Sequence, residues 1–181
     1  MSQQHHLIFR LFRQDTGGVA AVEFSIAATM LIVGILNAVD LGLYEYQRMQ
    51  VENSAQVGAQ AAWKACYDIS GMLPATTKCS GLNDAITAAI QSTSLGTAVS
   101  LTAGYPTEGY YCVNTSGALQ SVGDLSNKPA NCSDAGNSSA LPGDYIQVNV
   151  TYAYTPLFSN LTVMGASGIS SISMTSWMRL G

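Results

Sequence analysis

Charged side chains are scarce in this sequence. Only 10% of its 181 residues are charged, against 48% that are hydrophobic, and the formal net charge is -4. The lysines and arginines that follow Arg13 are scattered singly along the chain. Because nucleic-acid backbones are bound through clustered basic side chains, we expect no nucleic-acid partner.

Histidine is absent after His6, and the sequence contains neither a GxSxG nor an SxxK motif. A serine or cysteine nucleophile would therefore lack its usual base. The carboxylates lie in predicted loops or at element ends without a shared spacing, which favours surface solvation over acid and base catalysis; they are Asp68, Asp84, Glu108, Asp124, Asp134 and Asp144. We expect no catalytic residues, no enzymatic activity and no cofactor.

No pair of cysteines has CxxC spacing, although the chain has four cysteines, Cys66, Cys79, Cys112 and Cys132. Without CxxC spacing or nearby histidine, we expect no metal site. An even number of cysteines on an oxidising side of a membrane suggests two disulfides. Joining Cys66 to Cys79 and Cys112 to Cys132 closes the shortest loops, but three connectivities are open. Unpaired, buried cysteines are the alternative.

A long uncharged run is present near the N-terminus. No charged residue occurs from Phe24 to Val39. A helix from Val19 to Tyr44 would be about 39 Å long, enough to cross a bilayer with some tilt. Arg10 and Arg13 precede the run, which predicts a cytoplasmic N-terminus and an exported remainder. The run is longer than the apolar region of a secretory signal peptide.

The helical pattern continues beyond the uncharged run. Small and apolar residues recur at helical spacing on one narrow face: Tyr44, Val51, Ala55, Ala59, Ala62 and Cys66. We expect one long helix from about Gly18 to Lys64, half in the membrane and half projecting from it. Arg48 and Glu52 stand one turn apart and are expected to pair.

The second half of the chain changes its period. A short helix is expected over residues 83–93, with Asn83 as N-cap. Alternating apolar residues predict strands at 99–103, 109–114, 144–156 and 169–181, whereas 115–143 shows no period and is expected to be a loop. The predicted fold class is α+β, with a small antiparallel sheet packed on the outer half of the helix.

The start of the apolar run resembles a known processing signal. Gly18 lies five positions before Glu23, which is followed by Phe24. This arrangement, with the basic leader, looks like the type IV prepilin signal, in which a membrane peptidase cuts after the glycine. Residues 10–65, including Asp40 and Gly42 at the end of the apolar run, are similar to TadE-like pseudopilins of the tight-adherence (Flp-type) pilus systems.

The resemblance implies a division of the chain. Residues 1–18 would be a cytoplasmic leader removed by prepilin peptidase, and Val19 the new N-terminus. Residues 19–44 would span the membrane, 45–65 would continue the helix outside, and 66–181 would form a disulfide-stabilised α+β head. The chain would be a single-pass protein of the bacterial inner membrane with a periplasmic C-terminal domain, able to enter an extracellular pilus.

The implied function is structural. The chain would be a minor pilin or pseudopilin for priming, tip or base assembly of a tight-adherence type IVb pilus used in surface attachment and biofilm formation. Its partners would be prepilin peptidase, other pilin and pseudopilin subunits, the assembly machinery and the inner membrane. The alternative from another class is an uncleaved, membrane-anchored periplasmic domain that binds or senses a ligand.

Two acids in the helix require an explanation. A carboxylate in lipid costs about 2.5 to 3.5 kcal/mol on insertion scales. Glu23 could neutralise the amine created at Val19, on its own or a neighbouring chain, or lie at headgroup level with access to water. Asp40 lies about 26 Å further along the helix, where it is either an interfacial acid in water or a contact to another subunit. The resemblance implies an assembly or packing role for Glu23, Asp40 and Gly42.

Overall fold

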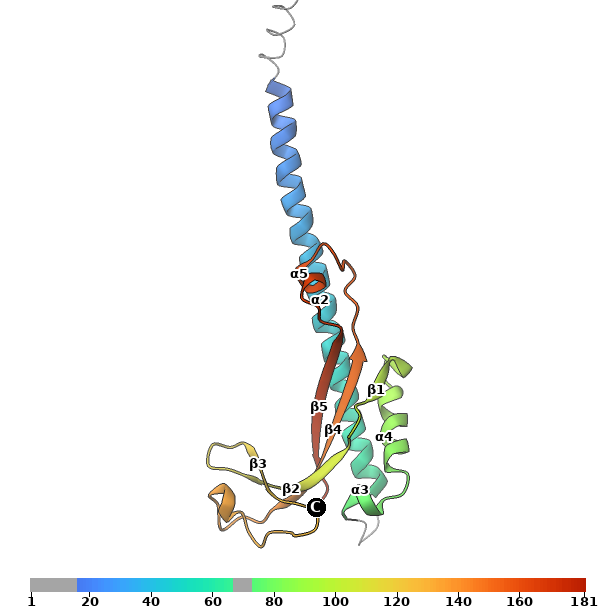
Figure 1. Cartoon of the computed structure of the whole chain (residues 1–181), viewed down its shortest axis with the longest axis vertical. Helices are drawn as coiled ribbons and strands as arrows, with labels where there is room; N and C mark the ends of the chain where they lie inside the picture. Colours follow the sequence, from blue (N-terminus) through green and yellow to red (C-terminus); the bar gives the residue numbers. More distant parts are fainter. Residues whose placement is uncertain (1–15, 67–72) are drawn as a thin grey trace, which may run out of the picture. The chain divides into compact units, whose positions relative to one another are not determined.

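The computed structural model describes residues 16–66 and 73–181, with side chains from Gly18 onward (Figure 1). Arg10 and Arg13 of the expected leader lie outside this range. The described chain separates into two compact units. One comprises the first part of the long helix, up to Leu43, together with Pro156–Gly168. The other comprises Tyr44–Thr155 and Ile169–Gly181.

The long helix, α2, runs from Thr16 to Cys66 without interruption. Both ends agree within two residues with the helix predicted from Gly18 to Lys64. Its sequence has no proline, and Gly34, Gly42 and Gly58 inside it keep helical backbone. The pattern of apolar residues therefore sufficed to identify this element.

The second unit contains a five-stranded antiparallel sheet. Its strands are β1 (Val99–Leu101), β2 (Thr107–Val113), β3 (Leu119–Gly123), β4 (Gly143–Ala153) and β5 (Ser171–Arg179). Strand β4 is central: β5 pairs with it from Ala153 back to Tyr145. Strands β1 and β2 pair with opposite ends of β4 on its other edge, and β3 pairs with β2. The predicted α+β fold with a small antiparallel sheet is confirmed.

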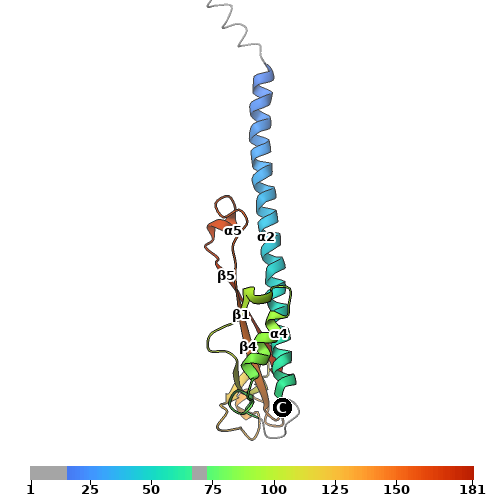
Figure 2. The same cartoon turned by 90° about the vertical axis from the view of Figure 1, so that its right-hand side faces the viewer.

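Short helices precede the first strand or lie between later strands. They are α3 (Ala75–Lys78), α4 (Leu82–Gln91) and α5 (Val163–Ala166), with 3-10 turns η1 (Gly96–Ala98) and η2 (Ser133–Ala135). Within the second unit, α4 and strands β1, β4 and β5 lie alongside the C-terminal half of α2 (Figures 1 and 2). Helix and sheet therefore enclose one core.

The core joins the small-residue face of α2 to one face of β4. Ile146, Val148 and Val150 on β4 are completely buried, as their alternation predicted. In the half of α2 that follows Tyr44, the completely buried side chains are Val51, Ser54, Ala55, Ala59 and Ala62. Ile86 and Ile90 from α4 fill the remaining space. Small side chains on α2 let these branched residues approach the helix backbone.

Gly58 marks the closest approach to the helix. A Cβ atom at this position would lie 2.7 Å from Cγ2 of Ile90 and 3.3 Å from Cγ1 of Val148. Real Cβ atoms essentially never have a neighbour as close as 2.7 Å. Only glycine allows α4 and β4 to pack this tightly here, which the sequence analysis did not anticipate.

Two disulfides join elements of the second unit. Cys66, the last residue of α2, bonds to Cys79 just after α3, with Cα atoms 6.0 Å apart. Cys112 on β2 bonds to Cys132 just before η2, with Cα atoms 5.7 Å apart. These are the pairs favoured by the shortest loops. Cys112, Cys132 and Ala135 form a small core of their own.

The expectation of a loop without structure over residues 115–143 is wrong. The region contains β3 and η2. Most β3 side chains are exposed, including Leu119, so the strand shows no apolar alternation in the sequence. Its backbone pairs with β2, and the Cys112–Cys132 disulfide holds the following segment to the same strand. Long-range pairing orders a stretch whose side chains give no signal.

Three local predictions are also corrected. Arg48 pairs with Glu45 at 3.6 Å rather than with Glu52. Helix α4 begins at Leu82, so that Gly81, with φ +81°, takes the N-cap position expected for Asn83. The first strand ends at Leu101 rather than at residue 103. Glycine is required at position 81 because the backbone that enters α4 has a left-handed conformation there.

We predict that Gly58→Val destabilises the protein. The added side chain must push Ile90 and Val148 away from α2, because neither methyl group ends a long flexible chain. Overpacking of this kind costs about 1 to 3 kcal/mol in the free energy of unfolding. Chemical denaturation of the full chain in detergent, followed by circular dichroism, measures this quantity.

Gln56→Val is the matched control, since Gln56 is an exposed residue of the same helix. Its effect should stay within about 0.5 kcal/mol, as is usual for surface sites. Equal denaturation midpoints for the two variants would contradict the close packing at Gly58.

Candidate functional site

The first part of α2 has an apolar surface that the chain leaves uncovered. The apolar window of this helix is long enough to cross a membrane, and none of it is buried. A helix from the core of a soluble protein would pass the same length test but would be mostly buried. The exposed large apolar residues of the first part are Val19, Val22, Phe24, Ile26, Met30, Leu31, Ile32, Val33, Ile35, Val39, Leu41 and Leu43. This half of α2 therefore fits a single-pass membrane anchor.

The residues of the predicted processing signal lie in the first turns of this helix. Gly18 is the third residue of α2, and a Cβ atom there would meet nothing within 4 Å. Val19, Glu23 and Phe24 are exposed. Val19 and Glu23 are four residues apart, so they lie on the same face of the helix. These residues are accessible at the start of α2, as cleavage requires. Cleavage after Gly18 itself stays a prediction.

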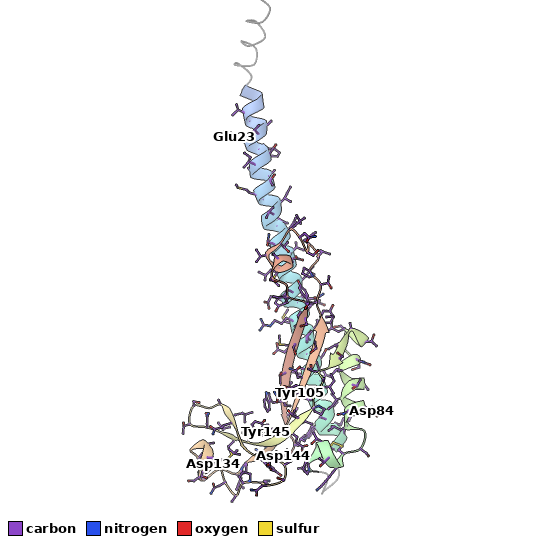
Figure 3. All side chains as sticks on the ribbon, in the orientation of Figure 1. Glu23, Asp84, Tyr105, Asp134, Asp144 and Tyr145 are labelled. Atoms are coloured by element: carbon purple, nitrogen blue, oxygen red, sulfur yellow. A yellow bond between two sulfur atoms is a disulfide. The ribbon has the colours of Figure 1, made fainter. Side chains whose placement is uncertain are left out.

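Glu23 differs from the other polar residues of the apolar half. Ser25 donates to the carbonyl of Ala21 at 2.7 Å, and Thr29 donates to that of Ser25 at 2.7 Å. These hydroxyls are satisfied within the helix, as lipid requires. Among the described residues, no hydrogen bond or ion pair reaches the carboxylate of Glu23, which projects from the bare helix (Figure 3). It is available to a group outside this part of the chain.

Asp40 has a different environment. It is completely buried, so the interpretation of an interfacial acid in water is wrong. Its Oδ1 accepts a hydrogen bond from the backbone N–H of Leu157 at 2.8 Å, and its Oδ2 accepts one from the hydroxyl of Thr162. Both carboxylate oxygens are thus satisfied by the segment Pro156–Gly168, which belongs to the same unit. A direct role in subunit contacts stays a prediction.

Asn37, one turn before Asp40, binds the same segment. Its Oδ1 accepts from the backbone N–H of Val163 at 2.8 Å, while its Nδ2 donates to the carbonyl of Val33 at 2.8 Å. Thr162 also serves as N-cap of α5, accepting from the N–H of Gly165 at 3.2 Å. Asn37 and Asp40 therefore fix both α5 and the turn before it to α2. Asn37 and Thr162 carry no signal in the sequence that predicts this contact.

Gly42 lies on the exposed surface of α2. A Cβ atom built there would meet nothing within 4 Å. No neighbour within the described chain therefore requires glycine at this position. Its predicted assembly role would depend on close approach by another chain.

Two carboxyl groups meet in the second unit. Glu108 on β2 accepts hydrogen bonds from the backbone N–H groups of Ala75 and Thr76, each at 2.7 Å. Asp144, near the start of β4, is only 1% exposed, and its carboxyl oxygens have no hydrogen-bond partner among the described residues. Burial and, to a lesser extent, the nearby Glu108 carboxylate together raise the pKa of Asp144 to about 7, against the opposing charge of Lys128. Asp144 therefore holds a proton at neutral pH more readily than a surface acid.

Tyr110 lies next to the Asp144 and Glu108 carboxyl groups. Strand pairing sets Tyr110 opposite Asp144, and the ammonium of Lys128 lies 5.4 Å from the centre of the Tyr110 ring. Burial raises the pKa of the Tyr110 hydroxyl, as do the charges of Asp144 and Glu108. Among the described residues, no three His, Cys, Asp or Glu side chains gather into a set that could hold a metal ion.

We predict that Asp144→Asn removes part of the pH dependence of stability. The pKa of Asp144 is about 7 in the folded chain and about 4 when unfolded, so the folded state binds its proton more tightly. The contribution of Asp144 is therefore greatest below about pH 4 and is lost as the pH rises towards 7. The variant should have the higher Tm at pH 8, by at least about 2 to 4 °C.

Thermal unfolding of the full chain in detergent at pH 5 and pH 8 measures the effect. Asp134→Asn, at an exposed position (Figure 3), is the control and should retain the wild-type loss of Tm between the two pH values. The burial argument is refuted if Asp144→Asn shows the same loss.

Comparison with known proteins identifies one region of the chain. Residues 18–60 match the family described as TadE-like protein. No curated protein and no solved structure matches the chain. The matched region covers the exposed apolar half of α2, including Glu23, Asp40 and Gly42, and most of the half that packs on the sheet. The resemblance recognised in the sequence is thereby confirmed over residues 18–60, which match the TadE-like family.

Proposed function

We propose that this chain is a minor pilin or pseudopilin that takes part in assembling a tight-adherence pilus at its base, its tip or its priming stage. The observation that carries the proposal is the apolar first half of α2, which is uncovered and has an unpaired acid near its start. Such a helix can be stored in the inner membrane and later packed among the helices of other subunits. The TadE-like match over residues 18–60 supports the pilus context.

The proposed mechanism begins with removal of residues 1–18 by prepilin peptidase. The cut would create an amine at Val19, next to the first turns of a helix in lipid. An ionised acid alone in lipid is costly, but pairing with an amine removes much of the cost. Glu23 lies one helical turn from Val19 and carries no partner within the described chain. It would bind its own amine or that of a neighbouring subunit, and so favour one helix register.

The remaining parts take roles that follow from their burial. Residues 19–44 would anchor the chain, 45–65 would hold the small-residue face, and residues 66–181 would form the exported head. Both disulfides lie in the second unit, which agrees with an oxidising compartment outside the cytoplasm. The head would distinguish this subunit from pilins that consist of little beyond the helix.

We predict that Gly18→Ala abolishes maturation without affecting membrane insertion. The space around Gly18 is open, so the extra methyl group disturbs no packing within the described chain. The change instead denies the peptidase the close approach to the backbone that glycine permits. Intact-mass analysis of the membrane fraction from piliated cells should show wild-type chain beginning at Val19 and variant chain that retains residues 1–18.

Gly34→Ala is the matched control, because Gly34 lies in the same helix with equally open surroundings. It should be processed as wild type. A wild-type chain that keeps residues 1–18 in cells with active prepilin peptidase would instead favour an uncleaved anchored domain that binds or senses a ligand.

We predict that Glu23→Gln impairs assembly. Glutamine has the same shape but cannot form an ion pair with an amine. A hydrogen bond to a charged group contributes about 1.5 to 3 kcal/mol, so incorporation into sheared filaments should fall about tenfold or more. Immunoblots of the sheared and membrane fractions measure the ratio. Glu52→Gln, an exposed acid beyond the apolar half, should leave it unchanged; equal incorporation of both variants would refute the pairing.

A further inference from the structure

The segment Pro156–Gly168 exposes apolar side chains to an unusual degree. Leu157 is 62% exposed, Leu161 64% and Val163 74%. No charged residue occurs between Asp144 and Arg179, so the whole segment is uncharged. A short connection exposed only to water would not be expected to display three large aliphatic residues in seven positions.

Hydrogen bonds hold this segment at a defined height along α2. The N–H groups of Leu157 and Val163 bond to Asp40 and Asn37, each at 2.8 Å. The hydroxyl of Thr162 donates to the second oxygen of Asp40 and accepts from the N–H of Gly165 at 3.2 Å. Because the segment and this part of α2 belong to one compact unit, their relative placement is determined by these contacts (Figure 2).

The height corresponds to the edge of a bilayer. Asn37 lies about 27 Å along the helix from Val19, and a hydrocarbon core is about 30 Å thick. At this level of α2, Val33, Ile35 and Val39 are exposed, and Val33 lies one turn before Asn37 on the same face. The segment is therefore attached where the apolar helix passes from acyl chains to headgroups.

We infer that residues 156–168 form a second membrane contact, which inserts Leu157, Leu161 and Val163 into the leaflet at the Asp40 end of α2. This inference rests on the anchoring role of α2 in the proposed function. The partner is lipid, because the exposed side chains are aliphatic, the segment is uncharged, and its attachment is continuous with the bare apolar surface of the helix. Backbone groups of the segment can still reach water in the headgroup layer.

The contact also explains the burial of Asp40. An ionised carboxylate at the edge of the hydrocarbon needs hydrogen-bond donors or water. The segment supplies donors from Leu157 and Thr162 and covers the carboxylate completely. Asp40 thus positions a membrane-inserted loop rather than exposing its charge to lipid.

Quenching of tryptophan fluorescence by brominated lipids tests the inference. The full chain carrying Trp63→Phe and Trp177→Phe serves as the background, reconstituted into phosphatidylcholine–phosphatidylglycerol vesicles. Three single tryptophans are compared: Leu161→Trp in the segment, Leu31→Trp within the apolar half of α2, and Leu141→Trp. Leu141 is a leucine of the other unit that is more exposed than Leu161, at 76% against 64%.

We expect bromines near the headgroup end of the acyl chains to quench Leu161→Trp at least about twofold more than Leu141→Trp, since the segment lies at the headgroup–acyl boundary. Leu31→Trp should be quenched most by bromines deep in the chains. If Leu161→Trp is quenched no more than Leu141→Trp while Leu31→Trp is quenched, the segment does not insert and the anchor stands. If Leu31→Trp is not quenched either, both the inference and the proposed anchor fail.

A second variant tests the role of Asp40. Adding Asp40→Ala to the Leu161→Trp chain removes the acceptors for Leu157 and Thr162, so quenching by shallow bromines should decrease. Glu52→Ala, which removes an exposed acid of the same helix, is the control and should leave quenching unchanged. Equal quenching with and without Asp40 would overturn its positioning role.

Discussion

The constraint on which the rest of this structure depends is that a single helix meets two environments. From Val19 to Leu43, α2 presents large apolar side chains that nothing in the described chain covers. From Val51 to Cys66, the same helix presents a stripe of alanine, serine and glycine that is completely covered. Large residues suit a helix whose neighbours are lipid tails or other helices. Small residues suit one whose backbone must lie close to a sheet.

The second half of the helix therefore determines how the sheet is built. Val148 of β4 and Ile90 of α4 can approach the helix this closely only because the facing position is Gly58. Strand β4 pairs with three other strands, so its position against the helix fixes the position of most of the sheet. The Cys66–Cys79 disulfide then joins the end of α2 to the segment that leads into α4. A larger side chain at Gly58 would disturb helix, strand and α4 together.

Periodicity predicted the elements that have one apolar face. Helix α2, helix α4 and strand β4 all show their period, and the structure places each within two or three residues of its predicted ends. Strand β3 shows no period because most of its side chains are exposed, and only pairing with β2 identifies it. Asp40 and its partner Leu157 are 117 positions apart in the sequence. The burial of Asp144 likewise depends on the packing of distant segments around it. Such contacts leave no local pattern.

The two acids of the apolar half, Glu23 and Asp40, differ in whether their own chain supplies hydrogen-bond donors to the carboxylate. Asp40 is supplied with donors by its own chain, so both of its carboxyl oxygens are already hydrogen-bonded before any assembly. Glu23 has no such donors in the described chain, although a bare carboxylate in lipid carries the larger cost. A carboxylate that has no partner within its own subunit is stabilised most by a partner that assembly or processing provides. This difference makes Glu23, rather than Asp40, the residue on which we expect ordered packing of the helix to depend.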